Sequence, residues 1–92
     1  MNPQQVRRAI AEKATAEGID VSSPHNAFIV AKFTPQAQTH GPLLWTFGDL
    51  NEAQLCAERQ PGDVYLMSTN PQHGLQKVEG KELLFVDAGA VL

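Results

Sequence analysis

The sequence predicts an α+β fold in two layers, with two helices on one face of a mixed sheet of about five strands. Two observations predict this class. Short apolar runs rich in β-branched and aromatic residues are typical of strands, and two longer segments carry apolar residues at helical spacing. The expected order of elements is α-β-β-α-β-β-β. Ninety-two residues suffice for one modest core, so residues 1–92 are expected to form a single α+β domain.

A strand–helix–strand unit forms the centre of the chain. The apolar run at residues 43–47 is the first strand, and a helix follows over residues 50–60. Asp49 is a good N-cap for this helix, and Glu52 stands three residues later, as in a capping box. Pro61 ends the helix. Because both connections are short, the strand after the helix is expected to run parallel to the first, which makes the sheet mixed.

The N-terminal helix is predicted over residues 3–17. Only Val6 and Ile10 are large apolar residues on its buried side, so it should lie on the sheet mainly through small residues. Arg7 and Arg8 have two interpretations. They belong to a solvated helix face, which is the commoner role, or they contact an anion.

The other strands are predicted over residues 27–33, 64–69, 75–79 and 82–86. The first of these is almost continuously apolar, which indicates a central strand covered on both sides. The last two are expected to form a hairpin across Gly80-Lys81. The expected register of this hairpin places Val78 opposite Leu83, Gln76 opposite Phe85, and Leu75 opposite Val86.

The predicted sheet has more apolar residues than two helices on one face can cover. Leu43, Trp45 and Phe47 share one side of their strand, while Leu44 points to the other. We therefore expect the chain to self-associate as a homodimer through an apolar sheet face, or by adding strands edge to edge. The alternative is that the sheet curls into a half-barrel and buries both faces itself.

Further contact residues are predicted on the second helix and in the loop before residue 43. Leu55 falls among the polar residues of its helix, where it contacts another chain or, alternatively, the edge of the first helix or a loop. The loop over residues 34–42 is long for a hairpin, and Gln36, Gln38 and His40 offer a partner uncharged polar contacts.

Composition excludes several classes of function. The net charge of −3 and the pI of about 5.4 argue against a nucleic-acid binder, which needs a basic face. A single cysteine, Cys56, rules out an internal disulfide and fits a reducing compartment. No apolar run approaches the length of a membrane span, and the N-terminal residues lack a signal-peptide core. The expectation is a soluble cytoplasmic protein that binds neither membrane nor nucleic acid.

No motif for catalysis, metal binding or a cofactor is present. The three histidines lack metal-ligand spacing, and Cys56 lies on the packing face of its helix. The predicted topology does bring His25, Asp49, Asn70 and His73 to one end of the sheet, beside a helix N-terminus that attracts anions.

Two functions follow from these observations. The first is a small non-catalytic interaction or regulatory module, acting as adaptor, inhibitor or subunit, whose partner is a second copy or another protein. The second is a small-molecule or anion-binding domain, with or without enzymic activity, at the end of the sheet that carries His25, Asp49, Asn70 and His73.

Overall fold

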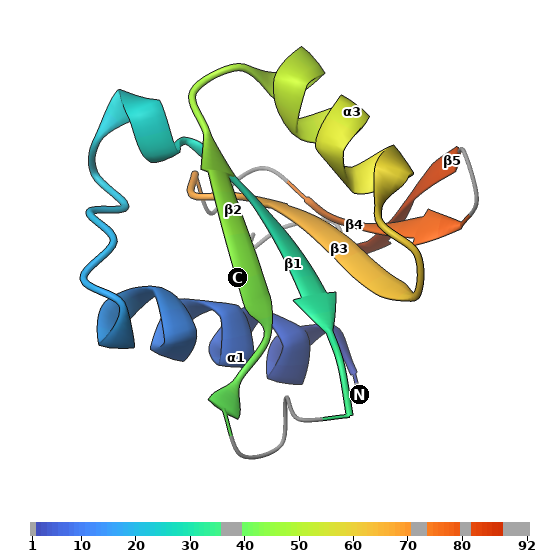
Figure 1. Ribbon diagram of the computed structural model, residues 1–92, viewed down its shortest axis with the longest axis horizontal. Coiled ribbons are helices and arrows are strands. Elements are labelled where there is room, and N and C mark those ends of the chain that lie inside the picture. The colour runs from blue at the N-terminus through green and yellow to red at the C-terminus, as the bar shows by residue number, and fades with distance from the viewer. Residues whose placement is uncertain (1, 36–39, 71–73, 80–81, 88–92) are drawn as a thin grey trace.

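The computed structural model of the protein describes residues 2–35, 40–70, 74–79 and 82–87, the last of these by their backbone only. Two α-helices and a five-stranded sheet confirm the α+β class (Figure 1). Among the described residues, no helix has the length and apolarity to cross a membrane. The elements in chain order are α1 (Pro3–Ala16), the short 3₁₀ helix η1 (Pro24–Asn26), β1 (Phe28–Phe33), β2 (Leu43–Phe47), α3 (Leu50–Arg59), β3 (Asp63–Ser68), β4 (Leu75–Glu79) and β5 (Glu82–Asp87).

Local capping sets the beginnings of both α-helices. Asn2 Oδ1 accepts a hydrogen bond from Gln5 N at 2.9 Å, and Gln5 Oε1 accepts one from Asn2 N at 3.0 Å, which completes a capping box at α1. Asp49 caps α3, as predicted, by accepting a hydrogen bond from Asn51 N at 3.2 Å. The reciprocal bond expected from Glu52 is not formed among the described residues.

The strands lie in the order β2-β1-β3-β4-β5, and every neighbouring pair is antiparallel. β2 and β3 run in the same direction, as predicted, but β1 lies between them. The prediction of a mixed sheet is therefore wrong. Val30 of β1 faces Trp45 on one side and Leu66 on the other, so β1 uses both of its edges for hydrogen bonding. An inserted antiparallel strand separates the two strands that a direct crossover would have paired.

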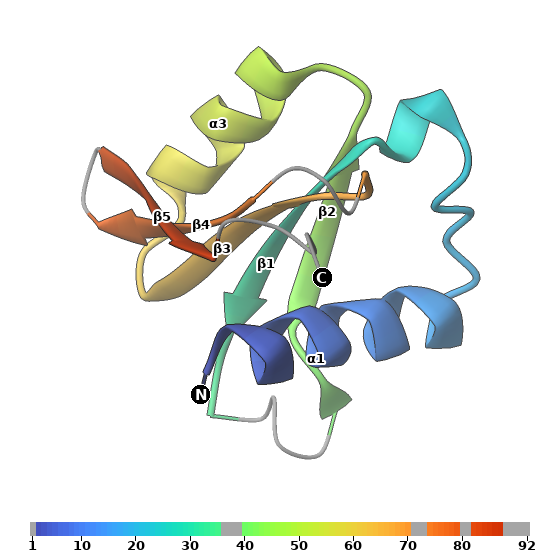
Figure 2. The same cartoon turned by 180° about the vertical axis from the view of Figure 1, so that it is seen from behind.

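The two α-helices cover opposite faces of the sheet (Figures 1 and 2). Ile29 and Val30 are successive residues that point to opposite faces, and both are fully buried. α1 packs on the face of Ile29, and α3 packs on the face of Val30. The prediction of two layers with both helices on one face is therefore wrong, because each apolar face needs its own cover. The α1-side core contains Val6, Ile10, Ile29, Ala31, Tyr65, Met67 and Leu75; the α3-side core contains Val30, Ala53, Ala57, Val64, Leu66 and Val78.

The layering bears on the prediction of self-association. That prediction assumed that the sheet has an apolar face without a helix, which a second copy covers or a half-barrel buries. The described residues of the central strands have a helix on each side instead, so these strands present no uncovered apolar face. β1 is a central strand covered on both sides, as its near-continuous apolar sequence predicts.

The hairpin of β4 and β5 follows most of the predicted register. Val78 lies opposite Leu83 and Gln76 lies opposite Phe85, as expected. Leu75 faces Asp87 instead of Val86, because the register shifts by one residue between Leu75 and Gln76. The predicted turn at residues 80–81 lies outside the described residues.

We expect Ile10→Ala to lower the free energy of unfolding by about 2–5 kcal/mol, because Ile10 is fully buried between α1 and the sheet. Leu55→Ala is the matched control on the other helix. Leu55 is 51% exposed, so its truncation should change the free energy of unfolding by no more than about 0.5 kcal/mol. Urea denaturation measures both values, and equal losses would contradict the packing described above.

Candidate functional site

One end of the sheet gathers three loops that are far apart in the sequence. At this end Phe28 begins β1, opposite Phe47 at the end of β2 and Ser68 at the end of β3. The η1 segment packs on the turn between β2 and α3. A methyl group placed on Gly48 would lie 2.9 Å from the carbonyl oxygen of Pro24, so only glycine permits this close approach.

The predicted ligand-binding residues lie on these loops. His25 is exposed in η1, and Asp49 is engaged as the cap of α3. Asn70 follows β3, where its N–H donates to Ser68 Oγ at 3.1 Å. His73 lies outside the described residues. The backbone positions of His25, Asp49 and Asn70 thus come to one end of the sheet, and a ligand site formed by their side chains stays a prediction.

Metal binding has no support in the described part of the chain. There, no three His, Cys, Asp or Glu side chains lie close enough together to hold a metal ion. Cys56 is partly buried against the α3-side core, and this burial raises the pKa of its thiol above the usual value. A thiol with a raised pKa is a weak nucleophile at neutral pH, which agrees with a packing role.

The predicted interaction residues are spread over several elements. Leu55 lies on α3 opposite the buried Ala53 and Ala57, and it is 51% exposed. It does not contact α1, which lies on the other face of the sheet. Trp45 is half-buried and packs against the α3-side core. His40 is exposed, and its carbonyl oxygen accepts a hydrogen bond from Lys13 Nζ at 2.8 Å. Gln36 and Gln38 lie outside the described residues.

The outward-facing backbone groups of β2 can be identified from the pairing of β1. Thr69 N donates to Ala27 O at 2.9 Å, which extends the β1–β3 ladder by one pair. Residues along a strand direct their N–H and C=O groups alternately to one edge and the other. The residues of β1 that bond to β2 are therefore the even-numbered ones, such as Val30 opposite Trp45. It follows that the backbone N–H and C=O groups of Trp45 bond to β1. Those of its two neighbours, Leu44 and Thr46, point away from the sheet.

These two neighbours, Leu44 and Thr46, lie at a sheet edge with which no other described strand pairs. β2 is an edge strand and pairs with β1 alone among the described strands. Natural edge strands usually carry Lys, Pro or a bulge that prevents pairing with another chain. β2 has none of these over residues 43–47, and Leu43 is 51% exposed beside the open edge.

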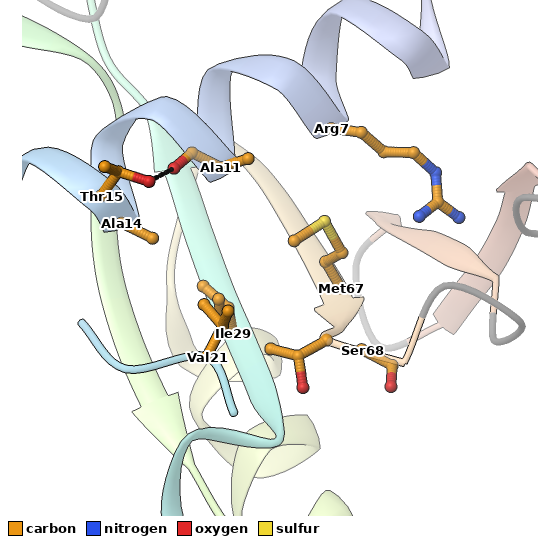
Figure 3. Close-up of a pocket in the computed structure, with 9 residues that line it drawn as sticks. Arg7, Ala11, Ala14, Thr15, Val21, Ile29, Met67 and Ser68 are labelled. Atoms are coloured by element: carbon orange, nitrogen blue, oxygen red, sulfur yellow. Dashed lines mark hydrogen bonds between the residues drawn. The ribbon is translucent and has the colours of Figure 1, made fainter. Parts of the chain in front are cut away.

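A separate cleft lies between α1 and the sheet, at the same end as His25 but on the α1 side. Figure 3 draws its lining residues: Arg7 extends from α1, and Met67 and Ser68 lie on the β3 side. Its volume is about 280 Å³. The lining residues are Arg7, Ala11, Ala14, Thr15, Val21, Ile29, Met67, Ser68 and Thr69.

The cleft was not predicted as a site, although one signal for it is present in the sequence. Beyond Ile10, the residues of α1 that face the sheet region are small, with Ala11 and Ala14 in the lining. A helix that lies on a sheet through small residues leaves space along its flank. For Arg7, the sequence leaves open a solvated helix face and an anion contact, because helix periodicity alone does not show which flank of α1 borders a cleft.

An ionic cluster that the sequence did not predict surrounds Tyr65. Lys77 Nζ lies 5.9 Å from the Tyr65 ring centroid, 3.6 Å from Asp63 Oδ1 and 3.5 Å from Glu79 Oε1. Burial, reinforced by the Asp63 and Glu79 carboxylates, raises the pKa of Tyr65. The pKa of Lys77 is also raised. The largest cause is the negative charge of the Tyr65 phenolate, and the next is the Asp63 carboxylate. Lys77 lies beside the Tyr65 ring because the two residues are opposite each other on the neighbouring strands β3 and β4.

Both raised pKa values predict that stability falls at alkaline pH. A folded-state pKa above the unfolded value of about 10 means that the folded protein holds its proton longer, so stability is present below pH 10 and is lost as the pH rises further. Tyr65→Phe should make this loss shallower. Tyr65 is the only tyrosine, so phenolate absorbance reports its titration directly. A folded-state pKa no higher than that of free tyrosine would contradict the prediction.

Comparison with known proteins supplies no relative. No protein-family model, no curated protein and no solved structure matches this chain. Any functional conclusion therefore depends on the residues and geometry of the chain itself.

Proposed function

We propose that this protein is a small non-catalytic interaction module, an adaptor, inhibitor or subunit, that self-associates through the edge of β2. The single observation that supports this proposal most strongly is the open edge formed by Leu44 and Thr46. A cytoplasmic location belongs to the same proposal and is supported by the lone Cys56.

A second copy fits this edge with a specific register. Antiparallel pairing of two β2 strands, with Trp45 opposite Trp45 of the second copy, brings Leu44 of each copy opposite Thr46 of the other. Every outward N–H and C=O group of these residues then has a partner. On the α3 side, Leu43 lies opposite Phe47 of the second copy, which covers the exposed leucine. The two five-stranded sheets would become one continuous sheet.

Backbone hydrogen bonds alone do not stabilise such a dimer. Each contributes about 0.5–1.5 kcal/mol net, whereas association costs about 4–15 kcal/mol in lost freedom of motion. Contacts among Leu43, Trp45 and Phe47 across the two copies have to supply the rest. We therefore expect a reversible dimer whose population depends on concentration.

Light scattering over a wide concentration range tests the proposal with one variant and one matched control. Leu43→Lys should raise the dimer dissociation constant at least tenfold, equivalent to about 1.4 kcal/mol, because it places a charge opposite Phe47 of the second copy. Leu55→Lys should leave the constant unchanged, since Leu55 has the same 51% exposure but lies on the outer side of α3. Trp45 is the only tryptophan, so its fluorescence should also change with concentration.

Thr46→Pro tests the backbone contribution directly. The Thr46 N–H has no partner within the sheet, and Trp45 is already extended, as a residue before proline prefers. The variant should keep the monomer fold and lose dimerisation. A wild-type monomer at all concentrations would overturn self-association. Loss of the dimer in Leu55→Lys but not in Leu43→Lys would assign the contact to α3 instead of β2.

Ligand binding beside His25, Asp49, Asn70 and His73 is a second proposal, favoured by the convergence of η1 with the start of α3. It is tested by thermal denaturation with inorganic phosphate, sulfate and a panel of metabolites. A ligand that raises the melting temperature of the wild type but not of His25→Ala supports it. No shift with any ligand would contradict it.

A further inference from the structure

We propose that Lys13 of α1 is a positioning residue for the β2 edge, and that it sets the affinity with which two copies associate. Lys13 contacts the backbone at His40 and Gly41, immediately before β2 begins at Leu43. Because this role concerns the surface proposed above for self-association, it rests on the proposed function. It adds that α1, which is not part of the edge, determines how firmly the edge is held.

The ammonium group of Lys13 bonds to the connection that leads into β2. Lys13 Nζ donates a hydrogen bond to the His40 carbonyl oxygen at 2.8 Å, although the two residues are 27 positions apart in the sequence. A hydrogen bond from a charged donor is stronger than one between neutral groups. The Lys13 side chain is 25% exposed, so water competes with this bond less than it would on an open helix face. The bond therefore holds the end of the connection against α1.

The aliphatic part of Lys13 packs against the next residue, Gly41. A methyl group placed on Gly41 would lie 3.0 Å from Lys13 Cδ and 3.4 Å from Lys13 Cβ. Gly41 also has a φ of 75°, in the left-handed region that glycine adopts at little cost. The chain thus turns in direct contact with the lysine, which holds this turn through both its stem and its ammonium group.

The position of the turn determines where β2 begins. Pro42 follows Gly41 and is fully buried, and its ring restricts φ. Leu43 comes next and forms the last β1–β2 pair, opposite Lys32. The Leu43 side chain is half exposed, so its own packing holds this end of the strand only weakly. The contacts of Lys13 with the preceding turn supply part of the order that Leu43 lacks.

A fixed position of Leu43 favours association through preorganisation. In the proposed register Leu43 lies opposite Phe47 of the second copy, so two such contacts form in each dimer. If the start of β2 moves freely in the monomer, it has to become ordered during association, and this loss of freedom weakens binding. Because the dimer is symmetric, the loss occurs in both copies and enters the dissociation constant twice.

Amide hydrogen exchange in the monomer tests the contact without reference to the dimer. Leu43 and Phe47 lie at the two ends of β2, and both direct their N–H groups to β1. Lys13→Met keeps most of the stem and removes the donor, so the Leu43 amide should exchange about tenfold faster. The Phe47 amide should exchange at the wild-type rate. Lys13→Arg keeps a charged donor and should restore slow exchange at Leu43.

Light scattering with the same variants shows whether the contact sets the affinity. Lys13→Met should raise the dimer dissociation constant about tenfold, and Lys13→Arg should stay near the wild type. Glu17→Gln is one control, because it removes the ion pair with Lys13 at 3.7 Å and leaves the bond to His40. Arg8→Met is the other, since it makes the same change of charge at an exposed position of α1. Both controls should associate like the wild type.

The outcomes separate the role of Lys13 from the proposed function. Unchanged exchange at Leu43 in Lys13→Met, or equal acceleration at Leu43 and Phe47, would overturn the positioning role whatever the oligomeric state. Faster exchange at Leu43 with an unchanged dissociation constant would overturn the effect on affinity and leave the dimer intact. Equal weakening by Arg8→Met would assign the effect to net charge. A wild type that stays monomeric while Leu43 still depends on Lys13 would overturn self-association and support the contact alone.

Discussion

The structure depends on the insertion of one strand, β1, between β2 and β3. Its successive residues Ile29, Val30 and Ala31 are all fully buried, so each face of the strand requires a cover. α1 provides one cover and α3 the other. Because β1 uses both edges for antiparallel pairing, β2 is displaced to the border of the sheet. The three-layer arrangement, the open edge and the end at which the loops meet all follow from this position.

Covering both faces restricts where another protein can bind. The apolar residues of the central strands are occupied by the two helices, so they offer no partner an exposed apolar face. The backbone of β2 remains, with Leu44 and Thr46 directing polar groups away from the sheet and Leu43 exposed beside them. Backbone groups that no described strand pairs with, on an uncharged strand, favour the addition of a further strand. Self-association by sheet extension is thus consistent with a fully covered core.

The same end of the sheet presents different chemistry on its two faces. On the α3 side, the η1 segment packs closely on Gly48, and Asp49 is engaged as a helix cap. On the α1 side, the small residues of the helix leave a cleft with Arg7 as its charged group. The difference arises from side-chain size. Where α1 has a large residue, Ile10, the interface is filled, and where it has alanines, space remains.

The sequence by itself determined the features that depend on neighbours within a few residues. Asp49 as the cap of α3, the extent of β2, and the pairing of Val78 with Leu83 were all predictable, because caps and hairpin pairings depend on residues close together in the sequence. Only the tertiary structure decided the strand order, the placement of the helices on opposite faces, and the cleft beside Arg7. These depend on pairings between segments separated by tens of residues, such as Ile29 with Met67. Apolar periodicity shows that a face is buried, but it does not show which element covers it.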